Sequence, residues 1–314
     1  MSTISQSPAE DAKKLARKLT KKVDTKVGPD LSFITDMALG GASGVIAKTA
    51  CAPLERVKIV LQTAKTSSGM GMLGTGRSLI SDQGIASLWR GNLTNCSRYF
   101  PTQAINFACK EKYQNLLVPP RENGFAPWFA GYLAAGGLAG ATSLTVVYPL
   151  EFAYTRLAAD TGAKKQFTGM TDVVKQITAK EGIKGLYRGY GPSVAGIIIY
   201  RAGYFGFYDA GKQMLGLDGT NASFILKFGL AMAVDISAAV IAYPIDTVRR
   251  RLMMQSGAAT QEFTTARGAV KHIYGLEGMA GFYKGCGANN VRAISSALVL
   301  VTYDEVKQAF NPKN

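Results

Sequence analysis

Residues 243–254 read Tyr243-Pro244-Ile245-Asp246-Thr247-Val248-Arg249-Arg250-Arg251-Leu252-Met253-Met254. The stretch ends a largely apolar segment, Phe224–Tyr243, and so places an acid and three consecutive arginines at the end of a candidate membrane span. An ionised group deep in a bilayer costs roughly 2.5–3.5 kcal/mol or more, so it persists only where it pairs or faces water. Successive helical residues turn by about 100°, so the three arginines point in different directions. We expect at least one to face an aqueous interior and another to pair with an acid on a neighbouring helix. The alternative is a basic cluster at the membrane surface that only orients the helix.

The composition favours a basic membrane protein. Charged residues make up 18% of the 314 residues and hydrophobic residues 47%, whereas soluble domains carry about 25% charged residues. The net charge of +15 predicts an anionic partner, which is nucleic acid, anionic lipid or a polyanionic solute. Nucleic acid is disfavoured, because the basic residues are dispersed through apolar segments and no nucleic-acid-binding motif is present.

The sequence lacks the patterns that mark an enzyme, a metal site or a bound cofactor. The four cysteines, Cys51, Cys96, Cys109 and Cys286, have no metal-ligand spacing, and the single His272, predicted on the surface of a short helix, excludes a multi-histidine site. Phosphate-binding loops, dinucleotide fingerprints and nucleophile elbows are also absent from the sequence. We therefore predict no catalytic residue, no metal and no cofactor.

Two motifs recur three times with the same period. Pro-x-acid motifs begin at Pro53, Pro149 and Pro244, which are 96 and 95 residues apart. A glycine followed by an aromatic-basic-Gly triplet occurs as Gly84 with Trp89-Arg90-Gly91, Gly182 with Tyr187-Arg188-Gly189, and Gly278 with Tyr283-Lys284-Gly285. Because two independent motifs keep one period, the chain is a triplicated unit of about a hundred residues. We place the repeats at 31–122, 123–219 and 220–314, after a polar, basic extension over residues 1–30.

Each repeat predicts two long helices, joined by a polar loop that holds a short amphipathic helix. The first helices are expected over Leu31–Ala64, Pro127–Ala159 and Ser223–Met254, and the second over Ser97–Leu117, Val194–Leu215 and Asn289–Phe310. Charges interrupt the apolar runs at Lys48, Arg98, Arg201, Asp235 and Arg292. Helices that line a wet cavity carry such charges, whereas simple anchors do not. Asp235 stands where the first two repeats have Gly44 and Gly140, and the repeat pattern does not explain it.

The threefold motifs resemble those of the mitochondrial carrier family, over essentially all of Leu31–Phe310. Within that family, the run Arg249-Arg250-Arg251-Leu252-Met253-Met254 resembles the RRRMMM signature of the ADP/ATP carriers, with Leu252 in place of a methionine. The resemblance implies an all-α membrane protein with six transmembrane helices in three pseudo-threefold repeats around a central cavity, with short matrix-side helices. It also implies the mitochondrial inner membrane, or that of a related organelle, as the location.

In function, the resemblance implies ADP/ATP antiport by alternating access, with ADP and ATP as substrates. A further expected partner is anionic, cardiolipin-like lipid at the matrix-side helix ends. Because three repeats supply a complete pore within one chain, we expect a monomer.

The resemblance implies a matrix gate at the proline motifs, in which the acid of one repeat pairs with the base of the next. The gate residues are Glu55, Lys58, Gln62, Glu151, Tyr154, Asp246 and Arg249. We predict the ion pairs Glu151–Arg249 and Asp246–Lys58, with Gln62 bracing one of them. The third link joins Glu55 to Tyr154, which forms a hydrogen bond but no ion pair, so this gate is weaker than the family norm.

A second, cytoplasmic gate is expected where an acid precedes a base by three residues. The pairs are Asp209 with Lys212 and Asp304 with Lys307, while the first repeat is degenerate around Glu111. This gate is therefore also incomplete. For every gate pair the alternative is an ordinary helix-end salt bridge worth less than about 1 kcal/mol.

The repeat arithmetic predicts the cationic end of a substrate site. The positions seven residues beyond the three motif glycines are Arg98, Gly196 and Arg292, which should lie at one depth. Two guanidinium groups suit phosphate, which they bind in bidentate fashion. Lys48, five residues before Pro53, adds a further cation.

The same depth predicts a place for a flat base. Gly196 leaves room for it, with Ile197 beside it and Tyr200 one turn further, although ordinary helix packing is the alternative for Tyr200. The subfamily has a serine before the Tyr-Pro of the third repeat, and this chain has Ala242, so one nucleotide contact is absent.

Two other functions stay open. A related carrier for another nucleotide, a coenzyme or phosphate is compatible with the departures at Tyr154 and Ala242. A proton leak or regulated pore is the second, but it leaves Arg98 and Arg292 unexplained. Counter-exchange across a nucleotide panel discriminates between these possibilities.

Overall fold

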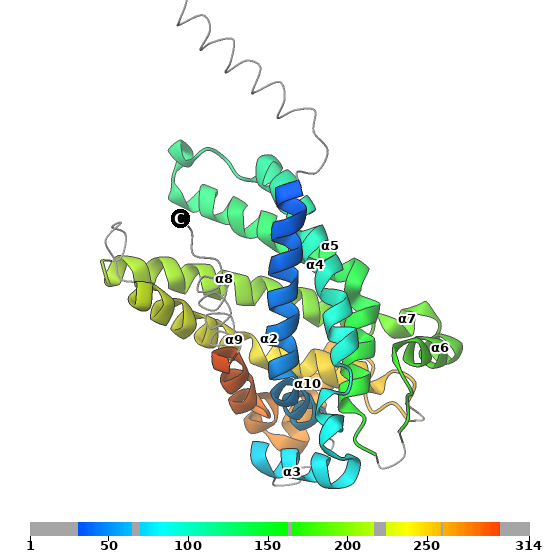
Figure 1. The fold of residues 1–314 in the computed structure, drawn as a ribbon. Coiled ribbons are helices and arrows are strands. Elements are labelled where there is room, and N and C mark those ends of the chain that lie inside the picture. Colours follow the sequence, from blue (N-terminus) through cyan, green and yellow to red (C-terminus); the bar gives the residue numbers. More distant parts are fainter. Residues whose placement is uncertain (1–30, 65–69, 163–164, 217–223, 259, 296–314) are drawn as a thin grey trace, which may run out of the picture. The chain divides into compact units, whose positions relative to one another are not determined.

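The structure is a computed structural model, which describes residues 31–64, 70–162, 165–216, 224–258 and 260–295 (Figure 1). The chain divides into two units, Met1–Ser43 and Gly44–Asn314, and every contact described below lies within the second. The predicted extension over residues 1–30 and the end of the last predicted helix, residues 296–310, lie outside the described residues.

The long helices follow the order that the repeats predict. They are α2 (Leu31–Thr63), α4 (Asn92–Leu117), α5 (Phe125–Ala159), α8 (Tyr190–Met214) and α9 (Phe224–Gln255). Residues 286–295 are helical and correspond to the beginning of the sixth long helix that the sequence predicts. Helices α4 and α5 lie side by side, as do α8 and α9 (Figure 1).

Short helices fill the polar loops between the long ones. Each loop contains one twelve-residue helix, α3 (Met72–Gln83), α6 (Met170–Glu181) or α10 (Ala266–Glu277). The remaining elements are η1 (Ile85–Trp89), η2 (Arg121–Asn123), α7 (Ile183–Leu186) and η3 (Met279–Tyr283). His272 lies on α10, partly buried, with Nε2 3.2 Å from a carboxylate oxygen of Glu262.

The second helix of each repeat begins three to five residues before its predicted start. The helix starts directly after the motif glycine, at Asn92 and not Ser97, at Tyr190 and not Val194, and at residue 286 and not 289. Gly189 explains the difference, because its φ of +88° turns the chain straight into α8 in a conformation that favours glycine. Gly91 and Gly285 have φ values of +85° and +80°.

Gly189→Ala is expected to destabilise the protein by about 2 kcal/mol or more. A non-glycine residue in the left-handed region costs roughly 1–2 kcal/mol, and the added Cβ would lie 2.8 Å from the backbone oxygen of Arg249. Gly191→Ala is the matched control, because no atom lies within 4 Å of its added Cβ. Thermal unfolding in detergent should show a lower midpoint for the first variant only, and equal midpoints would contradict the prediction.

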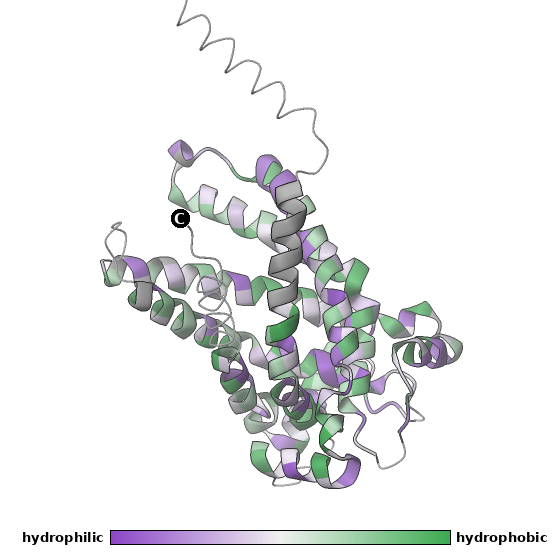
Figure 2. Cartoon of the chain, in the orientation of Figure 1, coloured by the Kyte–Doolittle hydropathy of each residue, from purple (hydrophilic) through white to green (hydrophobic). Residues whose placement is uncertain are grey.

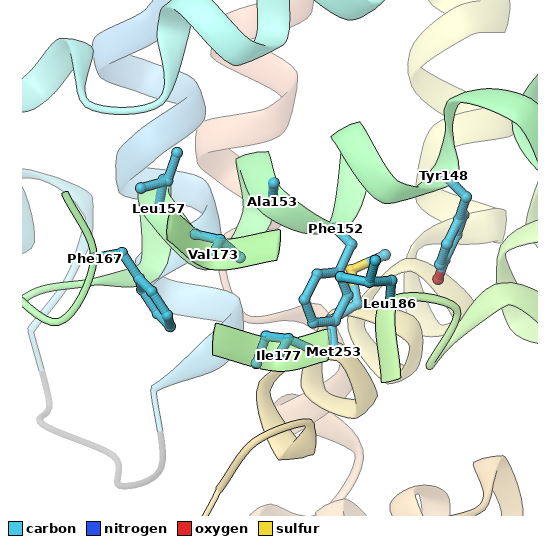
Figure 3. Close-up of a cluster of buried hydrophobic side chains, with 9 residues drawn as sticks. All are labelled: Tyr148, Phe152, Ala153, Leu157, Phe167, Val173, Ile177, Leu186 and Met253. Atoms are coloured by element: carbon cyan, nitrogen blue, oxygen red, sulfur yellow. The ribbon is translucent and has the colours of Figure 1, made fainter. Parts of the chain in front are cut away.

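Apolar side chains pack the end of α5 against α6 and α7. Phe152 of α5, Val173 and Ile177 of α6, and Leu186 of α7 are buried together (Figure 3). Met253 of α9 enters the same cluster and is fully buried. The cluster therefore joins the second repeat to the third.

A polar cluster joins the first repeat to the second. Arg56 of α2 is 1% exposed and donates hydrogen bonds to the backbone oxygens of Ala158 and Asp160, at 3.2 and 3.0 Å. Arg90 pairs with the carboxylate of Asp160 at 2.6 Å. These bonds satisfy buried charges and backbone groups that would otherwise be costly, and they hold the end of α5 beside α2.

Among the residues that the structure describes, two helices are apolar enough to cross a membrane by length and composition, namely α5 and residues 226–255 of α9. In Figure 2 hydrophilic residues lie among hydrophobic ones along the coloured parts of the long helices. Of the charged residues within the predicted spans, Lys48, Arg98, Arg201 and Arg292 line the cavity described below.

Candidate functional site

A cavity of about 470 Å³ lies between helices from all three repeats. Seven basic and three acidic side chains line it, so it carries a net positive charge. The basic residues are Lys48, Lys58, Arg98, Arg201, Arg249, Arg250 and Arg292, and the acidic residues are Glu55, Glu151 and Asp246. A concave site whose net charge is positive concentrates negatively charged ligands. The arrangement therefore suits an anion.

Asp246, the acid of the third proline motif, has the most ionic partners. Its carboxylate lies 3.0 Å from Lys58 Nζ, 2.7 Å from Arg249 Nε and 3.3 Å from Arg250 Nε. Gln62 donates a further hydrogen bond at 3.0 Å. One carboxylate thus joins α2 to α9 and lies among three positive charges, of which it neutralises the equivalent of one.

The acids of the other two proline motifs have one partner each from the following repeat. Glu151 lies 3.5 Å from Arg249, and Glu55 accepts a hydrogen bond of 2.7 Å from the Tyr154 hydroxyl. All three links predicted for the matrix gate are therefore present in the structure, two as ion pairs and one as a hydrogen bond. Their role as a gate stays a prediction.

The two arginines predicted to bind phosphate are already paired with acids of the proline motifs. Arg98 lies 2.6 Å from Glu151 and Arg292 lies 3.7 Å from Glu55. The physical reason is that an unpaired charge within the protein is costly, so a cation and an acid that line the same cavity lower their free energy by pairing. A ligand that binds these arginines must therefore compete with the acids of the proline motifs.

Two of the three consecutive arginines line the cavity, and the third turns away from it. Arg249 and Arg250 both contact Asp246, and Arg250 also donates to the Thr155 hydroxyl at 3.3 Å. Arg251 turns away to the short helix α10, where both of its terminal nitrogens lie 2.8 Å from the carboxylate of Glu277. A bidentate pair of this kind is strong and directional.

Glu277 also forms an ion pair with Lys284, whose Nζ lies 2.8 Å from the carboxylate oxygen Oε2. Burial raises the pKa of this carboxyl group, but the hydrogen bonds from Arg251 and Lys284 outweigh burial and hold the pKa below its usual 4.5. The group therefore stays ionised at neutral pH. It links the arginine run of α9 to the aromatic-basic-Gly triplet of its own repeat.

The apolar half of the signature run packs into hydrophobic clusters. Leu252 is buried with Val248, Phe263 and Ile273, while Met253 enters the cluster of Figure 3. Met254 packs against a small cluster that contains Ile59 and Tyr154. These three residues thus anchor α9 to elements of all three repeats.

The residues predicted for the substrate site lie together. Lys48, Arg98, Ile197, Tyr200 and Arg292 line the main cavity. Gly196 lines an adjoining cavity of about 250 Å³, which Tyr200 and Arg292 also line. Lys48 Nζ lies 5.4 Å from the centre of the Tyr99 ring, within the range of a cation–π contact. Substrate binding by these residues stays a prediction.

Three buried polar residues of the site escaped the sequence analysis. Asn95 donates to Glu55 at 2.7 Å, Asn289 accepts from Lys58 at 3.0 Å, and the Ser193 hydroxyl lies 3.3 Å from that of Tyr148. All three follow a motif glycine by four residues. The same repeat arithmetic that selected Arg98 and Arg292 would have found them.

Most of the predicted cytoplasmic gate lies outside the described residues. Asp304 and Lys307 belong to that part of the chain, as does the side chain of Asp209. Glu111 is exposed, and Lys212 Nζ lies 5.2 Å from the centre of the Tyr208 ring. The second gate therefore stays a prediction.

Three helical repeats that surround a basic cavity, with an acid two residues after each motif proline, define a membrane solute carrier. The chain belongs to the mitochondrial carrier family: residues 29–121, 126–219 and 220–314 each match the family described as "Mitochondrial carrier protein". It is accordingly a multi-pass, all-α protein of the mitochondrial inner membrane, and a transporter rather than an enzyme.

The similar proteins include several with closely related names. The chain is 45% identical to the "ADP,ATP carrier protein" of Kluyveromyces lactis, over 88% of this chain and 94% of the relative. It is 44% identical to the human "ADP/ATP translocase 4", over 93% and 96%. A third relative, the "ADP,ATP carrier protein" of Parachlorella kessleri, is 46% identical over 92% and 88%.

Proposed function

We propose that this chain exchanges ADP for ATP across the mitochondrial inner membrane by alternating access. The observation that carries the proposal is the placement of Lys48, Arg98 and Arg292 in one cavity with the acids of all three proline motifs. The names of the relatives support adenine nucleotides as the pair of substrates.

The contacts provide a route by which binding opens the gate. Arg98 holds Glu151 at 2.6 Å and Arg292 approaches Glu55 at 3.7 Å, so phosphates that take these guanidinium groups remove partners from two gate acids. The interaction with phosphate offsets the cost of separating the remaining pairs. The substrate binds most tightly in the occluded state, in which both gates are closed around it. This differential binding drives the change of access.

The two cavities together offer two kinds of contact. Basic residues, among them Arg292, line both, and the adjoining cavity adds the small side chains of Gly196 and Ala242 beside Ile197 and Tyr200. A nucleotide suits both, with charge at one end and a flat ring at the other. Because ATP carries one more negative charge than ADP, the exchange moves net charge and responds to membrane potential.

Counter-exchange in proteoliposomes tests the proposal. Vesicles loaded with ADP should take up labelled ATP or ADP, and unloaded vesicles should not. A panel containing GTP, CTP, coenzyme A and inorganic phosphate on the inside provides the comparison. Exchange of another anion without exchange of ADP would assign a different substrate, and uptake or conductance without any internal anion would indicate a pore or a leak.

The remaining partners belong to the same proposal. We expect anionic lipid at the matrix-side helix ends, where basic residues of the aromatic-basic-Gly triplets lie, and we expect a monomer, because one chain supplies all three repeats. We also place the repeat boundaries at 31–122, 123–219 and 220–314.

A further inference from the structure

Asp235 of α9 occupies a position that glycine occupies in the other two repeats. A Cβ at Gly44 would lie 2.7 Å from ring atoms of Tyr99, and a Cβ at Gly140 would lie 3.1 Å from Nη2 of Arg201. In these two repeats the position is therefore a close contact between neighbouring helices. In the third repeat this position has the carboxylate of Asp235 instead, and close helix packing does not explain a charged group there.

The carboxylate has one hydrogen-bond partner in the part of the chain that the structure describes. The Tyr200 hydroxyl of α8 donates to Oδ1 of Asp235, and no described basic group lies within salt-bridge distance of it. The charge of Asp235 is therefore not offset by a local ion pair, unlike that of Asp246, Glu151 or Glu55. Oδ2 is left as a strong acceptor.

Asp235 lines the smaller cavity, of about 250 Å³, together with small side chains. Gly196, Ala239 and Ala242 share its lining with Asp235 and Tyr200. The small residues leave space for a planar ring. Lys58, Arg249 and Arg292 line both this cavity and the main one, so a nucleotide whose phosphates bind these cations can place its ring among the small residues, beside the carboxylate of Asp235.

We propose that Asp235 is a specificity residue, which accepts a hydrogen bond from the exocyclic amino group of a 6-aminopurine nucleotide and holds Tyr200 in place beside the ring. This inference rests on the proposed function and adds the feature of the substrate that is recognised. Adenine presents a single amino group as donor, which one carboxylate oxygen can satisfy. Guanine presents two adjacent donors and would favour both oxygens, of which Tyr200 already uses one.

The test compares ADP with purine riboside 5′-diphosphate, which has the same ring without the 6-amino group. In proteoliposomes, the wild-type protein should need about ten times more of the analogue for half-maximal exchange, because a hydrogen bond to a charged group is lost. Asp235→Ala should raise the half-maximal concentration of ADP to that of the analogue and leave the analogue nearly unchanged. Asp235→Asn keeps a neutral acceptor and should discriminate to an intermediate degree.

Two further variants separate recognition from structure. Ser237→Ala is the matched control on the same helix, because the hydrogen bond of this exposed hydroxyl, within the described residues, is to the Ala233 carbonyl of its own helix, at 2.7 Å. It should behave like the wild type. Tyr200→Phe removes the donor to Asp235 and keeps the ring, so it should reduce the discrimination without eliminating it.

The outcomes are distinct. Equal handling of ADP and the analogue by the wild type, better exchange of GDP than of ADP, or an equal loss with both substrates in Asp235→Ala would each overturn the inference while the proposed exchange stands. Absence of ADP exchange by the wild type would overturn the proposed function itself. If Asp235→Ala does not assemble, the thermal shifts that ADP and the analogue produce in the wild type and in Asp235→Asn decide the question.

Discussion

Arg98→Ala is expected to reduce nucleotide exchange by at least two orders of magnitude. The guanidinium group lies in the cavity and contacts Glu151 at 2.6 Å, so the variant loses a phosphate ligand and leaves a buried acid with one partner fewer. Removing one member of a buried charge pair costs about 3–5 kcal/mol, and a tenfold change in rate corresponds to about 1.4 kcal/mol. Arg292→Ala is expected to act in the same direction. The measurement is the initial rate of ADP/ATP exchange in proteoliposomes.

Arg77→Ala is the matched control for this experiment, because it removes the same charge from an exposed position on α3. Its exchange rate should equal that of the wild type. Arg98→Lys keeps the charge without the bidentate geometry and should retain part of the activity. An Arg98→Ala protein that exchanges within threefold of the wild type would refute the assignment of this residue to the site.

Asp246→Asn is expected to cause the largest loss of stability in the set. Neutralising this carboxylate leaves Lys58, Arg249 and Arg250 crowded within a few ångströms of a group that no longer offsets their charge. The cost is about 3–5 kcal/mol, which corresponds to a fall of roughly 10 °C in the unfolding temperature. Thermal unfolding in detergent measures it, and the exchange assay should show loss of transport.

Two variants bracket that result. Asp82→Asn neutralises an exposed acid of α3, whose contact is a hydrogen bond of 3.1 Å from Ser78, and should leave the unfolding temperature nearly unchanged. Tyr154→Phe removes one hydrogen bond to Glu55, but Asn95 still donates to the same oxygen, so its effect should be smaller than that of Asp246→Asn. Equal unfolding temperatures for Asp246→Asn and Asp82→Asn would show that the gate contacts contribute nothing to stability.

The repeat pattern was sufficient to predict the architecture and much of the site. Prolines and glycines that recur with one period determine where Glu55, Glu151 and Asp246 lie relative to the bases, because equivalent positions of a repeated unit occupy equivalent places. The starts of the helices were harder to predict, because polar residues such as Asn92 and Asn95 are typical of a loop. Only the left-handed glycine before them shows that the helix has already begun.

Departures from the repeat were the part that sequence reasoning could not resolve. A tyrosine at position 154 could be interpreted because the equivalent positions hold Lys58 and Arg249, but Asp235 has no basic equivalent to suggest a partner. Its contact with Tyr200 joins two helices whose relative rotation depends on packing along their whole length. The pairing of Arg98 with Glu151 likewise depends on how far a flexible side chain reaches, which spacing does not specify.

The three motif glycines each contact the repeat that follows. A Cβ at Gly91 would lie 3.2 Å from the ring of Tyr154, one at Gly189 would lie 2.8 Å from Arg249, and one at Gly285 would lie 3.0 Å from the backbone oxygen of Lys58, back in the first repeat. Such a head-to-tail series closes on itself after three units, as three separate identical subunits could also do. Identical subunits, however, would line the cavity with three identical sets of side chains. In a single chain each repeat can have its own residue at an equivalent position, such as Tyr154 or Asp235. The lining can therefore match a solute that has no threefold symmetry.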